Sequence, residues 1–121
     1  MNYLLLIYAD ESERESSSPA DAQAMHEAYR KFTEDIAASG VLRAGDALEP
    51  VAMATTVRVR GGEAVVTDGP FAETREQLGG YYVIEAKDLD EAIGIAERIP
   101  PARFGTIEIR PVMEIAGLPS D

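Results

Sequence analysis

The sequence predicts a single α+β domain with the split βαβ order of a ferredoxin-like fold and one inserted β-hairpin. Apolar runs of strand length and two helical patterns follow one another in the order strand, helix, strands, strand, helix, strand. In mid-chain, Gly61-Gly62 separates two β-branched runs, which is typical of a hairpin. Two of the predicted strands are apolar on both faces, which indicates a sheet that is covered on both sides.

The first strand and the first helix are predicted near the N-terminus. Residues 2–9 are a dense apolar run whose length suits a strand, and residues 10–18 are an acidic, serine-rich loop. Ser18 then occupies a helix N-cap, Pro19 lies in the first turn, and Gly40 ends the helix. The apolar stripe of this helix recurs at helical spacing and consists of Met25, Ala28, Tyr29, Phe32, Ile36 and Ala37.

The rest of the chain is predicted to contain further strands and one more helix. Asp88 is a helix N-cap with Glu91 at the third position, and Pro100-Pro101 end that helix. Its apolar stripe is Leu89, Ala92, Ile93, Ala96 and Ile99. The predicted strands are an irregular one over 41–48, two hairpin strands over 54–60 and 63–67, one over 81–86 and a last one over 106–110.

The predicted domain covers residues 1–115, and residues 116–121 are a C-terminal tail. Two helices can cover only one face of the predicted sheet. Because the strands over 2–9 and 81–86 are apolar on both faces, the other face needs a second sheet, and the simplest source is another copy of the same chain. The sequence therefore predicts a homodimer whose sheets pack face to face.

Composition excludes several classes of function. The chain has no cysteine, so disulfides, thiolate metal sites and a cysteine nucleophile are excluded. The net charge is −11, from 11 basic and 22 acidic residues, and such a surface repels nucleic acid and anionic lipid. The apolar run over 2–9 lacks the basic residues of a signal peptide and is too short to span a membrane, so we expect a cytoplasmic protein.

The most specific local signal is the turn Asp68-Gly69-Pro70-Phe71, which directly follows the strand over 63–67. Asp68 is a turn-initiating carboxylate, Gly69 frees the backbone, and Pro70 fixes φ. Two interpretations stay open. Asp68 is either a general acid or base held at a strand end and shielded by Phe71, or a carboxylate that serves the turn by accepting backbone N–H bonds.

The sequence resembles the DGPF branch of the YCII-related proteins. The resemblance runs over residues 1–115 and rests on ATTVR at 54–58, TDGPFAETRE at 67–76, GGYY at 79–82 and IEIRPV at 107–112. It implies a dimeric α/β barrel with a cleft that holds an acid–base pair of a histidine and an aspartate. It also implies lyase-like chemistry in some relatives, which remove chloride from a chlorinated ring-cleavage product, and a genetic link of many relatives to extracytoplasmic-function sigma factors.

Asp68 is the first candidate for that acid–base pair, and His26 is the second. His26 is the only histidine and lies on the first predicted helix, as the family's histidine does, but about one turn further from the glycine that ends the helix. The alternative is an exposed histidine that flanks the apolar stripe. Phe71 and Glu73, which follow Asp68 closely in the chain, are candidates for contacts with a substrate.

Arginines and tyrosines on the strands are the remaining candidates. Arg58 and Arg110 lie on polar strand faces and would hold a substrate carboxylate, unless those faces point to solvent. Tyr8 and Tyr82 would line a cleft, unless they are core or interface anchors. We find no metal-ligand spacing, no phosphate-binding loop and no nucleophile elbow, so the prediction includes no metal and no cofactor.

Two functions from different classes follow. The first is a small-molecule-binding protein, with lyase- or isomerase-like proton transfer by Asp68 on a small anionic organic substrate. The second is a non-enzymatic regulatory or interaction module, with a sigma factor or another protein as its partner. A polar cleft around Asp68 would favour the first function, and an exposed apolar patch beyond the dimer interface would favour the second.

Overall fold

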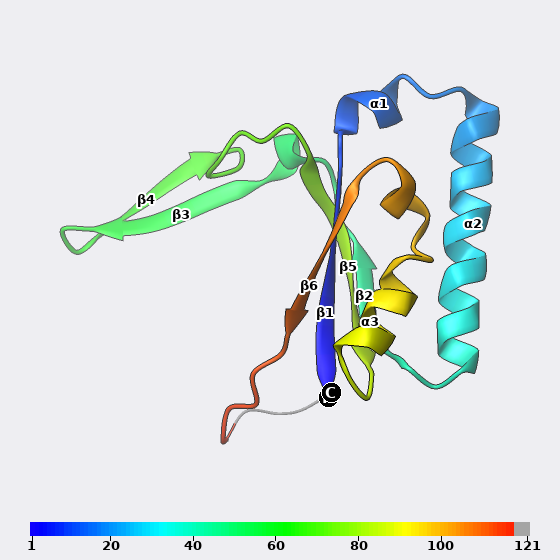
Figure 1. Ribbon diagram of the computed structural model, residues 1–121. Coiled ribbons are helices and arrows are strands. Elements are labelled where there is room, and N and C mark those ends of the chain that lie inside the picture. The colour runs from blue at the N-terminus through cyan, green and yellow to red at the C-terminus, as the bar shows by residue number, and fades with distance from the viewer. Residues whose placement is uncertain (118–121) are drawn as a thin grey trace.

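The computed structural model describes residues 1–117, and Figure 1 shows its helices and strands. In chain order these are β1 (Asn2–Ala9), α1 (Glu11–Glu15), α2 (Pro19–Ala38), β2 (Leu42–Ala47), η1 (Val51–Met53), β3 (Thr55–Arg60), β4 (Glu63–Asp68), β5 (Gln77–Glu85), α3 (Leu89–Ala96), η2 (Pro100–Arg103) and β6 (Thr106–Pro111). Most of the predicted tail over 116–121 lies outside the described residues.

The ferredoxin-like α+β fold is confirmed by the sheet. Its order is β2-β5-β1-β6, and each neighbouring pair is antiparallel. The helix α2 joins β1 to β2 and α3 joins β5 to β6, and each connection skips one strand that belongs to the other unit, which is the split βαβ arrangement. The inserted hairpin is confirmed as a separate two-stranded sheet of β3 and β4.

The predicted start of the long helix α2 is also confirmed. The Ser18 side chain accepts a hydrogen bond from the backbone N–H of Asp21 at 3.1 Å, and Pro19 is the first helical residue. Gly40 follows the end of the helix with φ +81°, a value that favours glycine. Phe32 and Ile36 of the predicted stripe are buried against the sheet.

Three details differ from the sequence-based expectation. The stretch predicted as a loop over 10–18 contains α1, because the Asp10 side chain accepts from the N–H of Ser12 at 2.9 Å and caps this short helix. In α3, Leu89 and Ile93 are exposed and Ile95 is buried instead, since the helix ends at Ala96 and turns a different side to the sheet. Strand β5 begins at Gln77, earlier than predicted.

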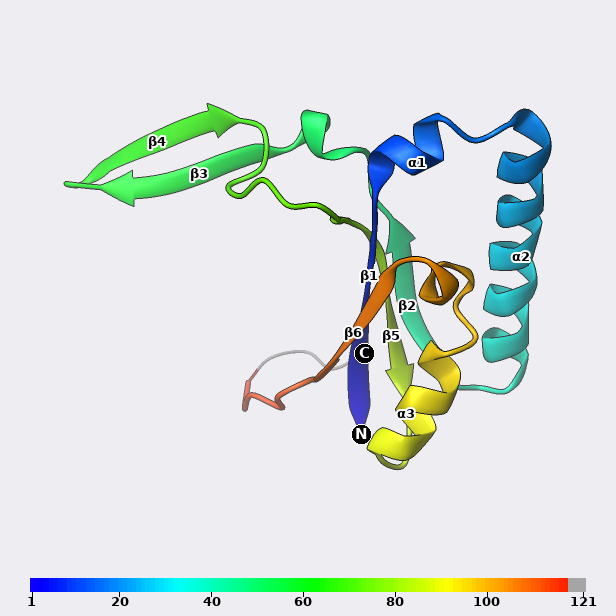
Figure 2. The same ribbon diagram turned by 45° about the horizontal axis from the view of Figure 1, so that its top comes forward.

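The core lies between the helices and one face of the sheet. Figures 1 and 2 both show α2 and α3 on the same side of the strands. The largest fully buried side chains are Leu5, Ile36, Ile84 and Ile99. Tyr82 belongs to this core, because its ring meets Phe32 edge-on with centroids 5.4 Å apart, and its hydroxyl lies 2.7 Å from that of Thr33.

Tyr29, on α2, makes the stability of this core sensitive to alkaline pH. Burial, together with the neighbouring Tyr82, raises the pKa of Tyr29 to about 12, while Arg14 opposes the shift. The neutral phenol is therefore favoured in the folded state, so its contribution to stability is complete below pH 10 and is lost as the pH rises through 12. We expect the free energy of unfolding, measured in urea, to fall less steeply over this range in Tyr29→Phe than in the wild type. Parallel curves would contradict this prediction.

The hairpin of β3 and β4, called the arm below, projects away from the rest of the molecule (Figures 1 and 2). All residues of β4 are exposed, and in β3 only Thr56 is partly covered. Helix α1 ties the root of the arm to the sheet, because Glu11 accepts from the N–H of Val51 at 3.0 Å and donates its own N–H to Gln77 at 2.9 Å. An isolated two-stranded hairpin is marginally stable at best in water.

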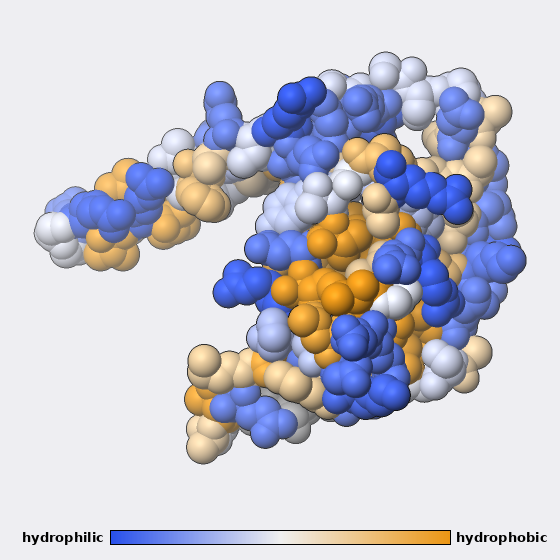
Figure 3. All heavy atoms as spheres, in the orientation of Figure 1, coloured by the Kyte–Doolittle hydropathy of each residue, from blue (hydrophilic) through white to orange (hydrophobic). Residues whose placement is uncertain are grey.

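The sheet face opposite the helices, called the open face below, is not covered by any element among residues 1–117. Figure 3 shows hydrophobic side chains along the arm and a hollow between the arm and the C-terminal segment that follows β6. No helix within the described part of the chain is long and apolar enough to cross a membrane.

Candidate functional site

The open face combines an apolar centre with polar side chains. Strand alternation places Leu4, Leu6 and Tyr8 of β1 on this face, because Tyr3, Leu5 and Ile7 point into the core. Val83 lies opposite Leu4. The polar members come from β2, β5 and β6 and are Asp46, Tyr81, Thr106, Glu108 and Arg110.

Tyr8, Glu108 and Arg110 form the polar cluster at the β1–β6 edge of the open face. The Tyr8 hydroxyl donates to Glu108 Oε1 at 3.3 Å, and Arg110 lies two residues further along the same strand face. Burial raises the pKa of Tyr8, and the Glu108 carboxylate raises it further by charge and by hydrogen bonding, while Arg110 opposes this. Tyr8 is therefore a hydrogen-bond donor at neutral pH, and Glu108 is an acceptor.

A second polar pair lies on the other side of the apolar centre. The Tyr81 hydroxyl donates to Asp46 Oδ2 at 2.6 Å, between β5 and β2. A bulge between Leu42 and Ala44 turns Asp46 onto the open face. The residue before Asp46 is Gly45, which leaves space for the Tyr82 ring, because a Cβ at position 45 would lie 2.7 Å from Cδ1 of Tyr82. The open face thus has polar groups along both edges and apolar side chains between them.

The two faces of the arm differ in character. The register pairs Val57 with Val66 and Thr55 with Asp68, so Asp68 lies on the same arm face as the exposed valines. Arg58 faces Val65 across the strands, on the opposite face. The arm is therefore amphipathic, and Asp68 lies at the root of its apolar face.

The turn after β4 has the expected backbone. Gly69 has φ +99°, which favours glycine, and its N–H donates to the carbonyl of Ala54 at 2.7 Å. The Thr56 hydroxyl donates to the carbonyl of Gly69 at 2.8 Å. These bonds hold the chain at the end of β4 and leave the Asp68 side chain outside the turn's hydrogen bonds. Phe71, predicted as a shield for Asp68, is 78% exposed.

The structure brings only some of the sequence-predicted site residues together. Tyr8 and Arg110 share the open face, whereas Asp68 and Arg58 lie on opposite faces of the arm. Tyr82 lies in the core, as the alternative interpretation held. The other candidates are exposed and lie apart from the open-face cluster: His26 on α2, and Phe71 and Glu73 in the segment between β4 and β5.

Sequence reasoning did not assign a role to Glu108, Asp46 or Tyr81. A usable signal existed for Glu108, which alternates with Ile107 and Ile109 on a short strand. Tyr81 alternates with Val83 along the strand, but no pattern in the sequence tells whether Tyr81 or Tyr82 faces the helices. For Asp46 the signal is hidden, since the bulge shifts its strand by one residue.

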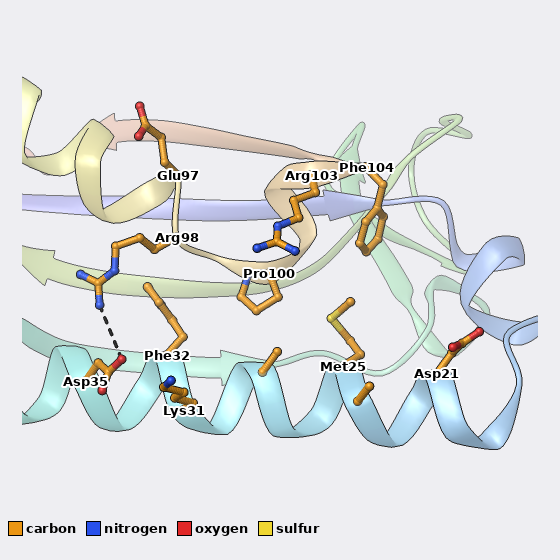
Figure 4. A pocket seen from close by; sticks show the side chains of 12 residues that line it. Asp21, Met25, Lys31, Phe32, Asp35, Glu97, Arg98, Pro100, Arg103 and Phe104 are labelled. Atoms are coloured by element: carbon orange, nitrogen blue, oxygen red, sulfur yellow. Dashed lines mark ion pairs between the residues drawn. The ribbon is translucent and has the colours of Figure 1, made fainter.

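A groove of about 710 Å³ lies on the other side of the molecule, between α2 and the segment from α3 to η2 (Figure 4). Arg98 reaches across it to Asp35 at 3.9 Å and lies over the Phe32 ring, with Cζ 5.6 Å from the centroid. The charges of its lining cancel, with three basic residues, Lys31, Arg98 and Arg103, against three acidic ones, Asp21, Asp35 and Glu97. No sequence-predicted site residue lines this groove.

A second cavity, of about 550 Å³, lies near the start of β5 and is acidic. Its lining has one basic residue, Arg75, against Asp10, Glu13 and Glu76. Ser12 lowers the pKa of Asp10 by hydrogen bonding, and Glu76 accepts from the Thr106 hydroxyl at 2.8 Å. Within residues 1–117 no group of three or more histidine, cysteine or acidic side chains could hold a metal ion. This cavity suits neither an anion nor a metal.

Comparison with known proteins identifies the family of this chain. The model of the YCII-related domain matches residues 1–116. An uncharacterised protein of Rhizobium meliloti (strain 1021) is 39% identical over 118 residues, which cover 93% of this chain and 92% of that protein. The DGPF branch stays a prediction, because the match is to the family as a whole. A match over nearly the whole chain shows that this protein belongs to the YCII-related family.

Proposed function

We propose that this protein is a homodimer that binds a small organic carboxylate on the open face and moves a proton on it without a cofactor. The observation that carries the proposal is the hydrogen-bonded pair of Tyr8 and Glu108, with Arg110 on the same strand face beside an apolar surface. An anion-binding group, a proton acceptor and a proton donor are the parts that such chemistry requires.

Arg110 supplies the affinity for the carboxylate. Its guanidinium has no ion pair within the described part of the chain, so its planar fork is available for two parallel hydrogen bonds. Leu4 and Leu6 lie on the neighbouring strand and provide an apolar floor for the body of the ligand. The net charge of −11 opposes the binding of anions elsewhere on the surface, so the position of this arginine decides where an anion binds.

Glu108 is the proton acceptor in the described chain. Tyr8 holds the Glu108 carboxylate by donating to it, and the raised pKa of Tyr8 keeps the phenol protonated at neutral pH. A proton taken from a carbon next to the bound carboxylate would pass to Glu108. Its return at another carbon would give an isomerisation, whereas departure of a leaving group with its electron pair from the neighbouring carbon would give an elimination. Asp68, the acid–base candidate of the sequence, is absent from this cluster in a single chain.

The homodimer is proposed because the arm and the open face both need cover. Val57, Val59 and Val66 are 61%, 62% and 63% exposed on the apolar face of the arm. Covering these three side chains contributes about 3–5 kcal/mol, since complete burial of a valine is worth about 1.5–3 kcal/mol. Two-fold symmetry doubles this, which is comparable with the 4 kcal/mol or more that association costs.

Calorimetric titration with benzoate and with fumarate tests the ligand class. We expect wild-type protein to bind at least one of them, and Arg110→Gln to weaken that binding at least about tenfold, because hydrogen bonds to a charged group are lost. Arg103→Gln, in the helix-side groove, is the matched control and should bind as the wild type does. Loss of binding in Arg103→Gln alone, or no binding to the wild type, would contradict the proposal.

The exposed arm also supports a second candidate function, a regulatory or interaction module with a sigma factor or another protein as its partner. The same valines would then contact that partner instead of a second copy. The two functions differ in one measurable property. A chain that is monomeric at micromolar concentration, with its arm uncovered, would favour the interaction module.

A further inference from the structure

Both polar edges of the open face are joined by a single row of residues across the sheet. Asp46 of β2 lies opposite Tyr81 of β5. Leu6 of β1 lies opposite Tyr81 on one side and opposite Glu108 of β6 on the other. Because residues directly opposite each other on neighbouring strands point to the same face, these four side chains form one line, with Leu6 between the Asp46–Tyr81 pair and Glu108. The line crosses three strand spacings, about 14 Å between the outer strand axes.

The neighbouring row gives a ligand its direction. Arg110 lies opposite Leu4, Leu4 lies opposite Val83, and Val83 lies opposite Ala44, so this row has a charged end on β6 and is apolar from there on. Strand β6 is at the edge of the sheet, so the apolar surface beside Arg110 extends only toward β5 and β2. A ligand whose carboxylate is held by Arg110 therefore lies with its body over the leucines and its far end toward Asp46 and Tyr81.

The Asp46–Tyr81 pair offers a ligand acceptors of hydrogen bonds. The Tyr81 hydroxyl donates its single proton to Asp46 Oδ2 at 2.6 Å. A carboxylate has acceptor atoms only, so the pair presents a negative charge and oxygen lone pairs. A hydroxyl or ammonium group forms a charge-assisted hydrogen bond with such a pair, whereas a second carboxylate is repelled by it. The pair thus distinguishes ligands by the polarity of their far end.

We infer that Asp46 and Tyr81 bind the far end of the ligand and select ring-sized carboxylates that carry a hydroxyl or amino group opposite the carboxylate. The inference rests on the proposed function, which places the carboxylate on Arg110, and it adds the two residues that determine specificity. A carboxylate of two or three carbons does not reach from one edge of the face to the other. A dicarboxylate places its second negative charge against Asp46.

This placement agrees with the proposed proton transfer. Glu108 lies two residues from Arg110 on the same strand face, so it is next to the carboxylate end of the ligand and three strands away from Asp46. The carbon beside the carboxylate is therefore the part of the ligand that Glu108 can reach. Asp46 is then a binding residue, and it takes no part in the proton transfer.

Calorimetric titration with three probes that differ only opposite the carboxylate tests the inference. The probes are benzoate, 4-hydroxybenzoate and terephthalate. None of them has a hydrogen on the carbon next to its carboxylate, so the titration measures binding without reaction. We expect wild-type protein to bind 4-hydroxybenzoate about tenfold more tightly than benzoate, because its hydroxyl donates to a charged acceptor, and terephthalate at least about tenfold more weakly than benzoate.

Asp46→Asn should remove this discrimination and bring the three affinities to within about threefold of one another, because a neutral amide of similar shape replaces the carboxylate. Tyr81→Phe retains the carboxylate, so terephthalate should still bind more weakly than benzoate. The matched control is Asp90→Asn, in the first turn of α3, which makes the same change in charge and should keep the wild-type order of affinities.

Failure of the inference can be told apart from failure of the proposed function. If the wild type binds benzoate and Arg110→Gln weakens that binding, but the order of the three probes is the same in Asp46→Asn as in the wild type, the inference is overturned and the proposed function stands. If the wild type binds none of the three probes, or if Arg110→Gln binds benzoate as the wild type does, the proposed function fails and the inference fails with it.

Discussion

Val66→Asp is expected to separate the proposed dimer into monomers, while Val65→Asp leaves it intact. The two residues are neighbours on β4, but Val66 shares the apolar face of the arm with Val57, and Val65 lies opposite Arg58 on the other face. An unpaired carboxylate at a buried contact costs at least about 2 kcal/mol, and a two-fold symmetric dimer contains two of them. The dissociation constant should therefore rise at least about 1000-fold in Val66→Asp.

Sedimentation equilibrium of the wild type and both variants measures this difference. Both substitutions add the same charge to an exposed position of the same strand, so differences in net charge and in strand propensity cancel. Circular dichroism should show the same helix content in all three proteins, because the arm lies apart from the core. A wild-type monomer, or equal dissociation of the two variants, would show that the apolar face of the arm does not form the dimer contact.

Leu5→Ala is expected to lower the free energy of unfolding by about 3 kcal/mol, a typical loss for a completely buried leucine. Leu5 lies in the middle of β1, where its side chain has no exposed surface and packs in the core with Ile36 and Ile84. Small domains have a total stability of about 5–15 kcal/mol, so this one substitution removes a large part of it. Leu4→Ala, one residue away on the open face, should cost less than about 1 kcal/mol in the monomer.

Urea unfolding of both variants in a Val66→Asp background makes this comparison in a monomer. In the dimeric background Leu4→Ala should weaken association instead, since Leu4 lies on the open face, which the proposed second copy would cover. Equal losses for Leu4→Ala and Leu5→Ala in the monomer would mean that both faces of β1 pack within one chain. That result would contradict the finding that the sheet face opposite the helices is uncovered in a single chain.

Local chemistry was sufficient to predict most of the elements. The Ser18 cap, the two glycines of the arm tip and the Asp88 cap each act within a few residues, and each appears where the sequence indicated it. The misses have mainly tertiary causes, although the Asp10 cap of α1 is local. Helix α1 is held by contacts of Glu11 with η1 and β5, and the exposed positions of Leu89 and Ile93 depend on how α3 docks on the sheet.

The candidate site was harder to predict than the fold. Arg110 was identified on the polar face of its strand and Tyr8 as a tyrosine able to line a cleft, and the structure places both on one face. Asp68 was identified from a conspicuous turn, but a turn motif does not tell whether its strand lies in the main sheet or projects from it. His26 has a side chain suited to acid–base chemistry but does not lie near the other candidates, since it is exposed on α2 away from the polar groups of the open face.

By itself, the sequence determined the order of the elements, the split βαβ topology and the apolar character of both faces of β1 and β5, because alternation and capping are local properties. Only the tertiary structure decided which face the helices occupy. Tyr81 and Tyr82 show why: both faces of their strand are apolar enough to be buried, so the docking of α2 and α3 made one tyrosine a core residue and left the other beside Asp46. The tertiary structure likewise places Asp68 on the projecting arm, and not on the open face with Tyr8 and Arg110.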